Sequence, residues 1–317
     1  MSAPLVSVVI RTKDRPHFLR GALEGVAGQD LRDFECVVVN DGGRDVSEVI
    51  EPFADSARVR YVNVETSIGR CAAGNRGIEE ARGKYISWLD DDDLYYPNHL
   101  STLTGLLEQG DYLAAYSDAY EARQVLREDG SYEVVDRRLV LKNDFHPVRF
   151  FQHVPFHLVS FMHRRECVEK LGGFDESLDV LEDWDLFFRL SQDYTFHRVP
   201  VITAEYRIRD DASQAITTMR EEFLRTRESL FQKYFHTAVP AFVEMYFEQQ
   251  EGMAAMRERV TALEGELERL REDLEQVRAA SSSTGTSAPG GSGASDAKGA
   301  DSGSGGRRKR PGFFRSR

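Results

Sequence analysis

The sequence predicts an α/β protein whose core is an open, mostly parallel sheet flanked by helices. Four short runs are predicted to be strands: 5–10, 34–39, 59–64 and 85–89. The first is rich in β-branched residues, as buried strands are, and the fourth is apolar. Each is followed by a helix-like stretch, and this alternation is typical of parallel strands joined by right-handed crossovers. The first, second and fourth runs end in polar loops, and open α/β sheets bind ligands outside the carboxyl ends of their strands. The same pattern therefore predicts the edge of the sheet at which a ligand would bind.

The length and charge of the chain limit its class. It has 317 residues, enough for one large domain or two smaller ones, and a net charge of −12. Residues 281–317 carry a net charge of +5, so the preceding body carries −17, which argues against nucleic acid as the main partner. Three separated cysteines form neither a metal spacing nor an even disulfide set, as in a reducing cytosol. The chain shows no signal peptide and no apolar stretch of about eighteen residues, so we expect a cytoplasmic protein.

The loops after the first three strands suit a nucleotide diphosphate. The first strand leads into loop 11–16, where Thr12 could frame a base, and a helix follows over 18–26. The second strand ends in Asp41-Gly42-Gly43, where Asp41 could accept a hydrogen bond from a base imide, although Asp-Gly-Gly is also typical of a simple turn. A helix over 46–54 and the third strand follow. Arg70, at the start of the next helix, could meet a base or a phosphate, or it could be a solvated helix-start residue.

The fourth strand runs directly into four carboxylates, Asp90 to Asp93. Adjacent anions repel one another by roughly 1 kcal/mol or more per close pair at a protein surface. A cation would relieve this repulsion, and carboxylate oxygens are the ligands that Mg²⁺ and Mn²⁺ prefer. The alternative is an acidic surface turn that caps the next helix. The neighbouring ligand-ready loops favour a metal site.

The middle of the chain predicts further elements of the sheet. We expect a helix over 98–109, a strand over 112–116, a hairpin over 121–141 that turns at 128–131, and a core strand over 156–162. His146, His153, His157 and His163 lie close together in the sequence, but their spacing matches no common zinc pattern. Packing or the lining of an acceptor site is the preferred interpretation of these histidines.

A second acidic cluster follows a Gly172-Gly173 turn. Glu182, Asp183 and Asp185 occupy the first turn of a predicted helix, where the helix dipole favours anions. They could serve only as an acidic cap. A carboxylate fixed in a first helical turn is also well placed to take a proton from an attacking hydroxyl. A strand over 199–206 then leads to Arg207 and Arg209, which could reach a diphosphate.

The C-terminal part predicts self-association. Residues 214–236 look helical, and Pro240 could begin another helix. Apolar residues then follow with spacings of 3 and 4 in alternation: Met253, Met256, Val260, Leu263, Leu267, Leu270, Leu274 and Val277. This is a heptad seam, and its g-to-e pairs (Arg259–Glu264, Glu266–Arg271, Asp273–Arg278) are opposite in sign, as a parallel homotypic coiled coil requires. The alternative is one helix folded back on the main domain.

The last residues combine a polar linker with a basic tail. From Ala279 onward Ser, Gly, Thr and Ala predict disorder. In the tail, 307–317, basic residues flank two phenylalanines. This composition suits weak docking on anionic lipids at the inner face of the cell membrane. A tail that only improves solubility fits equally well.

Three blocks of this sequence together resemble the nucleotide-sugar-binding half of family-2 glycosyltransferases with a GT-A fold. These are SVVIRTKDRPHFLRGAL, VVVNDGG and GRCAAGNRGIEEARGKYISWLDDDD, and the resemblance resumes at LGGFDE and LEDWDL, so that it covers about residues 4–210. It implies that Asp90 and Asp92 form the Asp-x-Asp motif for a divalent metal and the sugar nucleotide, and that Asp183 is the base. Arg11, Asp14 and Ser67 depart from the residues that are frequent in that family.

We therefore predict an inverting glycosyltransferase that uses Mg²⁺ or Mn²⁺, a nucleotide-diphosphate sugar and a glycan or lipid-linked acceptor. The expected domains are a GT-A domain (1–212), a helical extension (213–250), a coiled coil (251–280) and the linker with its basic tail (281–317). The candidate catalytic residues are Asp183 and Glu182, and the candidate metal ligands are Asp92 and Asp90. The candidate donor-binding residues are Thr12, Asp14, Arg15, Asp41, Arg70, Asn75, Asp90, Asp91 and Arg207.

Two other functions stay open at this point. A nucleotidyltransferase would also combine an α/β sheet with metal carboxylates, but it would need a glycine-rich triphosphate loop, and loop 11–16 has no glycine. A coiled-coil scaffold that only binds a nucleotide would not need the full set of acidic groups that this chain retains.

Overall fold

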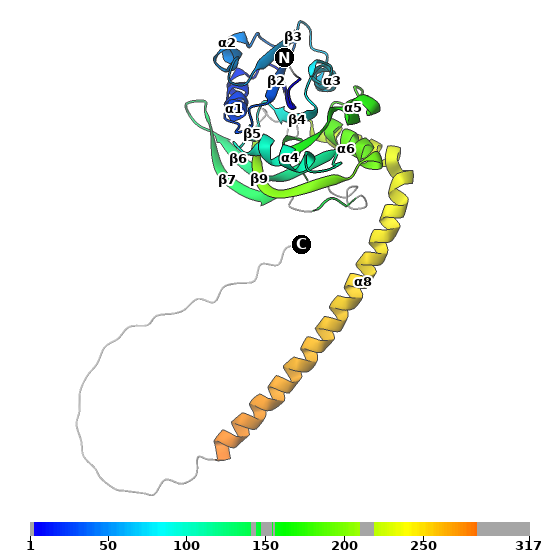
Figure 1. Cartoon of the computed structure of the whole chain (residues 1–317). Helices are drawn as coiled ribbons and strands as arrows, with labels where there is room; N and C mark the ends of the chain where they lie inside the picture. Colours follow the sequence, from blue (N-terminus) through cyan, green and yellow to red (C-terminus); the bar gives the residue numbers. More distant parts are fainter. Residues whose placement is uncertain (1–2, 141–143, 147–153, 155, 210–218, 284–317) are drawn as a thin grey trace, which may run out of the picture. The chain divides into compact units, whose positions relative to one another are not determined.

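A mixed nine-stranded sheet organises the described part of the computed structural model, which comprises residues 3–140, 144–146, 154, 156–209 and 219–283 (Figure 1). The strand order is β3-β2-β1-β4-β8-β6-β9-β5, with β7 paired to β6. The chain divides into two compact units, residues 1–251 and residues 252 onward, and the sheet lies in the first. The predicted α/β class is confirmed.

The first four long strands form a parallel half-sheet. β1 (Val6–Thr12) pairs with β2 (Phe34–Asp41) on one side and with β4 (Tyr85–Asp90) on the other, and β2 pairs with β3 (Val59–Val64). Every residue of β1 and β2 is buried. Strands covered on both faces are apolar without alternation, which explains why the sequence showed continuous apolar runs here.

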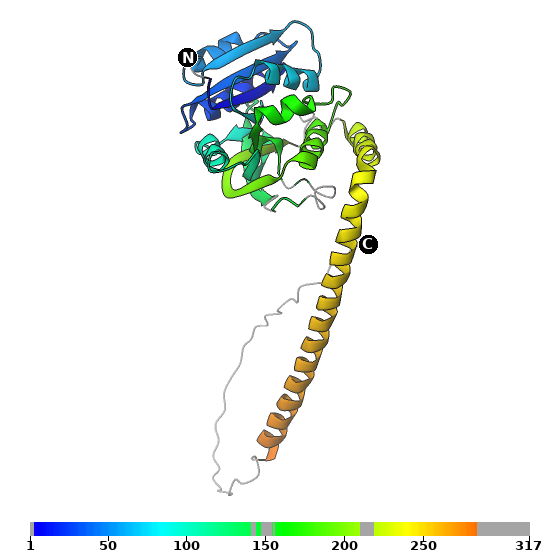
Figure 2. The same ribbon diagram turned by 45° about the vertical axis from the view of Figure 1, so that its right-hand side comes forward.

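Helices cover both faces of this half-sheet, and the residues of β1 point alternately to the two sides. Val8 and Ile10 join the core under the first group of helices, whereas Val9 joins the core on the opposite face. α1 and α2 lie on one side of the strands and α3 on the other (Figures 1 and 2). The first group contains α1 (Pro16–Ala27), α2 (Ser47–Ile50) and α4 (His99–Leu107), and the second contains α3 (Arg70–Glu80), α5 (Arg165–Leu171) and α6 (Glu182–Asp193). The predicted helix over 46–54 is α2 followed by a short 3-10 turn, Glu51–Phe53.

The second half of the sheet mixes directions. β8 (Phe161–Arg164) is antiparallel to both β4 and β6 (Ala114–Leu126), and β6 is parallel to β9 (Phe196–Arg209). β6 and β7 (Tyr132–Val140) form the predicted hairpin, and β5 (Leu94–Tyr95) pairs with β9.

Two of the predicted strands have other bounds. The strand expected over 112–116 begins at Ala114 and continues into the hairpin, because the same strand pairs with β8 and then with β7. The run 156–162 is mostly not a strand: Leu158–Ser160 form a 3-10 turn before β8. Apolar content marks this run as buried, and periodicity alone cannot tell a short buried strand from a buried turn.

The C-terminal helix is longer than predicted. α8 (Arg220–Ser283) is continuous through Pro240, so the expected start of a new helix there is wrong. A proline inside a helix removes one backbone hydrogen bond, and the remaining turns carry the helix past it. Residues 214–218 of the predicted helix and the basic tail lie outside the described residues. In the described ranges no helix is both long and apolar enough to cross a membrane.

Candidate active site

The loops after β1, β2 and β4 meet at one edge of the sheet. In the parallel register Arg11 of β1 lies opposite Asp90 of β4, and Thr12 lies opposite Asn40 of β2. The chain order reverses at β1, which has β2 on one side and β4 on the other. Ligands of open α/β sheets bind at this kind of switch point.

Two arginines join the strand-end carboxylates to the second acidic cluster. Arg11 donates from Nη2 to Asp90 Oδ1 at 2.7 Å and from Nη1 to Glu182 Oε1 at 3.1 Å. Arg70 Nε lies 2.9 Å from the same Glu182 oxygen, and its Nη2 lies 3.9 Å from Asp90 Oδ2. Residues that are remote in the sequence are therefore brought into one charged site at the start of α6.

The middle carboxylates of the run bind the first loop. Asp91 is buried and accepts hydrogen bonds from Thr12 Oγ1 at 2.8 Å and from Arg15 Nη1 at 3.2 Å. Asp92 Oδ2 accepts from Arg15 Nη1 at 3.3 Å and also pairs with Arg209, which is buried at the end of β9. These contacts fix the loop after β1 against the loop after β4.

Three carboxylates of the run, Asp90, Asp91 and Asp93, differ in the direction in which the site shifts their pKa. Burial alone would raise the pKa of Asp90, but the charges of Arg11 and Arg70 outweigh burial and lower this pKa. Burial and the neighbouring Asp92 raise the pKa of Asp91 to about 7. Burial and Asp92 also raise the pKa of Asp93 well above its usual value, although Asp93 accepts a hydrogen bond from the backbone N–H of Arg207 at 2.8 Å. The run therefore does not carry four full charges at neutral pH.

Glu182 and Asp183 are adjacent in the sequence but differ in their surroundings. Glu182 is buried, and both Arg11 and Arg70 pair with it. Asp183 is half-buried, and the only donor to its side chain among the described residues is the N–H of Trp184 at 2.9 Å. Burial and then the charge of Glu182 raise the pKa of Asp183 to about 7. Asp183 is thus the carboxylate in this turn that is available to take up a proton.

The turn before α6 has an unusual backbone. Leu181 has φ 60° and ψ 24°, in the left-handed region that non-glycine residues rarely adopt. Strained residues persist where the surrounding structure holds them, and they concentrate at functional sites.

Carboxylates from both acidic clusters act on Tyr206 of β9. Burial raises the pKa of its phenol above the usual value, and the charges of Asp93, Asp92 and Asp183 raise it further. Its ring stacks on His157 with the ring centroids 4.0 Å apart. Tyr206 is not among the site residues predicted from the sequence.

Arg11 is also missing from the predicted site residues. A charged residue at the end of an otherwise apolar strand, as Arg11 is, gives a signal that could have identified it. Arg209 was expected to reach a diphosphate, but its contact with Asp92 could not be predicted, because it depends on how β9 crosses the sheet.

Three predicted donor-binding residues have hydrogen bonds that hold loops. Asp41 accepts from Ile68 N at 2.7 Å, Ser67 Oγ at 2.8 Å and Gly69 N at 3.2 Å. Asp14 Oδ1 accepts from Arg44 N at 2.9 Å. The Asn75 amide binds both the N–H and the carbonyl of Phe174, at 2.7 and 3.0 Å. A carboxylate can accept about four hydrogen bonds, so Asp41 retains capacity for a base, and the role of all three in donor binding stays a prediction.

Two of the histidines in the middle of the chain, His157 and His163, pack against aromatic residues. His163 is buried and accepts a hydrogen bond at Nε2 from Trp88 Nε1 at 3.0 Å, and burial lowers its pKa to about 4. His157 stacks on Tyr206. His153 lies outside the described residues.

The donor set at Asp90 and Asp92 fits a divalent cation. In the described ranges, no three His, Cys, Asp or Glu side chains come together as a complete protein site. Mg²⁺ is commonly held by one or two carboxylates together with substrate phosphates, so two are sufficient. Arg15 and Arg209 both contact Oδ2 of Asp92, and its Oδ1 accepts no hydrogen bond from the described residues.

Comparison with known proteins agrees with this architecture. The family model "Glycosyl transferase family 2" matches residues 7–172, which is just over half of the chain. The uncharacterized glycosyltransferase YwdF of Bacillus subtilis is 31% identical over 224 residues, which cover 69% of this chain and 81% of that protein. The uncharacterized glycosyltransferase RP339 of Rickettsia prowazekii is 30% identical over 213 residues, 62% of this chain and 63% of that protein.

Solved structures share the fold. The crystal structure of S. aureus TarS 1-349 matches 64% of this chain with a TM-score of 0.52 and 16% identity, and the match spans 60% of that chain. Its complex with UDP-GlcNAc matches 65% of this chain with a TM-score of 0.51, and the match spans 59% of that chain. The predicted resemblance is confirmed at the level of the family. This chain belongs to glycosyl transferase family 2.

Proposed function

We propose that this chain is an inverting glycosyltransferase that moves a sugar from a nucleoside diphosphate to a hydroxyl of a glycan or lipid-linked acceptor. The observation that carries the proposal is the pairing of Arg11 and Arg70 with both Asp90 and Glu182, next to Asp183. Membership of the family supports the reaction class. The TarS complex with UDP-GlcNAc supports a nucleotide sugar as the donor class.

The proposed reaction is a single displacement. Asp183 accepts the proton of the acceptor hydroxyl while the hydroxyl oxygen bonds to the anomeric carbon, on the face opposite the diphosphate. The bond from the anomeric carbon to the diphosphate oxygen breaks, and its electron pair leaves with the nucleoside diphosphate. A pKa of about 7 makes Asp183 a stronger base than an exposed aspartate. Glu182 pairs with Arg11 and Arg70 and keeps them in place.

A divalent cation, Mg²⁺ or Mn²⁺, belongs to the proposal. Asp90 and Asp92 would hold it, and when bound it supplies Lewis-acid stabilisation of the diphosphate. Arg11 and Arg15 orient these two carboxylates. On the donor side we assign Thr12, Asp14, Arg15, Asp41, Arg70, Asn75, Asp90, Asp91 and Arg207. A thermal-shift titration of UDP and GDP with and without Mn²⁺ checks the cation, since equal shifts in both conditions would contradict it.

The substitution Asp183→Asn tests the mechanism. We expect turnover to fall by roughly 10²- to 10⁴-fold, the usual contribution of general base catalysis, with nucleotide affinity nearly unchanged. Turnover is measured as nucleoside diphosphate release from the UDP- or GDP-sugar that gives the largest thermal shift, with water as acceptor. Asp179→Asn, the same change at an exposed position nearby, is the matched control. Undiminished turnover of Asp183→Asn would remove this residue from the mechanism.

We further propose that the chain forms a homo-oligomer through a parallel coiled coil over residues 251–280. The heptad seam and its complementary g-to-e charges support this proposal. Oligomerisation would strengthen a weak contact of tail 307–317 with an anionic membrane. Sedimentation with phosphatidylserine vesicles checks the tail: equal binding after removal of residues 307–317 would contradict its role.

A further inference from the structure

A second carboxylate in the first turn of α6 is completely buried. Asp185 has 0% of its side chain exposed and lies two residues after Asp183. A buried carboxylate is tolerated only when it is paired and hydrogen-bonded. The partners of Asp185 therefore determine whether this turn keeps its position.

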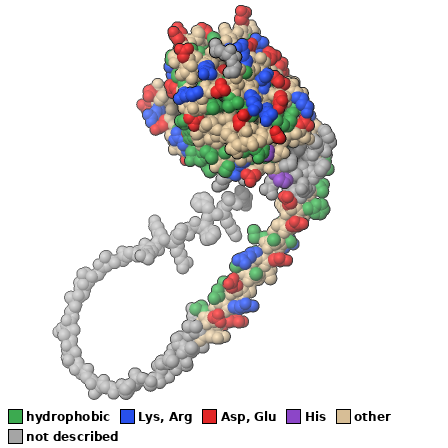
Figure 3. All heavy atoms as spheres, viewed as in Figure 1, with side chains coloured by type: hydrophobic (Ala, Val, Ile, Leu, Met, Phe, Trp, Pro, Cys, Tyr) green, Lys and Arg blue, Asp and Glu red, His purple; other side chains and the backbone are tan. Residues whose placement is uncertain are grey.

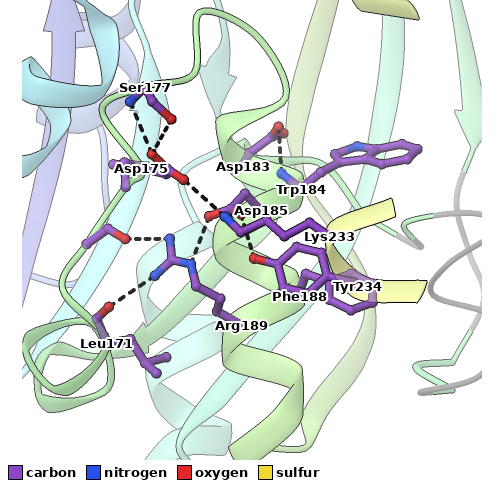
Figure 4. Close-up of polar contacts among 12 residues, drawn as sticks. Leu171, Asp175, Ser177, Asp183, Trp184, Asp185, Phe188, Arg189, Lys233 and Tyr234 are labelled. Carbon is purple, nitrogen blue, oxygen red and sulfur yellow. Dashed lines mark hydrogen bonds and ion pairs between the residues drawn. The ribbon is translucent and has the colours of Figure 1, made fainter. Parts of the chain in front are cut away.

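Two of these partners come from α8, far along the chain. Asp185 Oδ1 accepts from Tyr234 Oη at 2.6 Å and from Lys233 Nζ at 2.9 Å, and its Oδ2 accepts from Arg189 Nε at 2.8 Å (Figure 4). Lys233 also binds Asp175 Oδ2 at 3.0 Å. All of these residues lie in the first compact unit of the chain.

Packing holds the two α8 residues against α6. The Tyr234 ring stacks on Phe188 of α6 with centroids 4.4 Å apart and an interplanar angle of 26°. Figure 4 shows the Lys233 and Tyr234 side chains reaching from α8 toward Asp185. A hydroxyl and an ammonium group from one helix thus share a single oxygen of a buried anion on another.

The third partner connects the same carboxylate to the glycine turn. Arg189 donates to Asp185 and also to the backbone carbonyls of Leu171 and Gly173, at 3.2 and 2.6 Å. Asn75 of α3 binds the backbone of the next residue, Phe174. Asp185 therefore links α8, α6 and the turn that packs on α3.

We propose that Lys233 and Tyr234 are positioning residues that hold the first turn of α6, and with it Asp183, in the geometry needed to take up the acceptor proton. This inference rests on the proposed role of Asp183. Both residues lie beyond the segment that matches the family model, residues 7–172, and it is their contact with Asp185 that connects the start of α8 to the proposed site. A displacement of about 1 Å at a reacting group can cost about 10²-fold in rate.

The test uses the full chain with Lys233→Met, Tyr234→Phe and the double variant. Tyr234→Phe removes one oxygen and keeps the ring that stacks on Phe188. Lys233→Arg keeps the charge and serves as the conservative variant. Turnover of the sugar nucleotide with water as acceptor, KM for the sugar nucleotide, affinity for the nucleoside diphosphate and Tm are measured for each.

We expect the double variant to lose about tenfold in kcat, with KM and nucleotide affinity within about twofold of the unchanged chain. Lys233→Arg should recover most of the activity that Lys233→Met loses. The matched control is Lys170→Met, which removes another lysine whose ammonium pairs with α6, at Asp193 3.3 Å away and at the other end of the helix. Its kcat should not change.

Three outcomes would overturn the inference. The first is an unchanged kcat in the double variant. The second is a loss of kcat in Lys170→Met that equals the loss in the double variant. The third is a parallel fall in kcat and nucleotide affinity, which a general loss of structure would cause. If the double variant fails to fold, Tyr234→Phe alone decides, with an expected loss of several-fold in kcat. Undiminished turnover of Asp183→Asn would instead refute the proposed function, so the two failures are distinguishable.

Discussion

Neighbouring residues of the same chemical type have different tasks in this site because their partners differ. Glu182 is enclosed by Arg11 and Arg70, whereas Asp183 has no cation among its hydrogen-bond partners in the described residues. The same contrast separates Asp90, which two arginines keep ionised, from Asp93, which burial favours in its protonated form. The position of each side chain relative to the guanidinium groups determines these differences.

The raised pKa of Asp183 predicts the pH dependence of turnover. A base must be unprotonated, and Asp183 is mostly protonated below a pKa of about 7. We therefore expect kcat to rise about tenfold per pH unit at acidic pH and to level off above about pH 7. A kcat profile that is flat between about pH 5.5 and 8 would contradict this role.

The substitution Glu182→Gln tests the cause of this shift. It removes the charge that, after burial, raises the pKa of Asp183 most, so the acidic limb of the profile should move to lower pH. Nucleotide affinity measured over the same pH range is the control, since it separates binding from proton transfer. A limb that stays in place or moves to higher pH would show that Glu182 does not act on Asp183 through its charge.

At the scale of elements, α3 lies very close to β1 because of one glycine. A Cβ atom built on Gly77 would lie 2.3 Å from Cγ1 of Val9, which is buried in the middle of β1. The β-branched Val9 side chain cannot rotate freely out of the way. α3 carries Arg70 at its start, so this contact also sets the position of a site residue.

We expect Gly77→Ala to lower the free energy of unfolding by about 1–3 kcal/mol, the usual cost of overpacking a core. The matched control is Gly105→Ala in α4, an exposed helical position where a Cβ meets no atom within 4 Å. That change should raise stability by about 0.4–1 kcal/mol, because alanine restricts the unfolded chain. Chemical denaturation measures the free energy of unfolding of both variants. Equal changes of this free energy in the two variants would refute the close contact between α3 and β1.

At the scale of the whole molecule, α8 presents an apolar seam to solvent. The side chains of Met253, Met256, Val260, Leu263, Leu267, Leu270 and Leu274 are all between 40% and 66% exposed. Figure 3 shows hydrophobic side chains beside charged ones along this helix. A single helix gains no burial from such a stripe, whereas a second copy of the helix would cover it.

The proposed coiled coil predicts the mass of the protein in solution. Multi-angle light scattering should give at least twice the 36.0 kDa of one chain. Leu263→Asp with Leu270→Asp places charges in the seam and should give the mass of a monomer. Ala255→Asp with Ala262→Asp adds the same charges at two heptad positions outside the seam and should leave the oligomer intact. A monomeric unchanged chain at micromolar concentration would contradict the proposal.

Local patterns in the sequence determined much of this protein. The apolar runs predicted β1, β2 and β4, because buried strands need apolar residues, and the polar residues that follow these strands predicted the edge at which the candidate site lies. The alternating 3 and 4 spacing predicted the apolar seam of α8, since a stripe along one helix depends only on positions within that helix.

Only the tertiary structure decided which residues meet. Arg209 reaches Asp92, Glu182 reaches Arg11, and Lys233 reaches Asp185 across long stretches of chain, and no local spacing encodes such contacts. The different pKa values of Asp90, Asp91 and Asp183 have the same origin. Burial and the distance to the nearest charge set them, and both exist only after the sheet and its helices have packed.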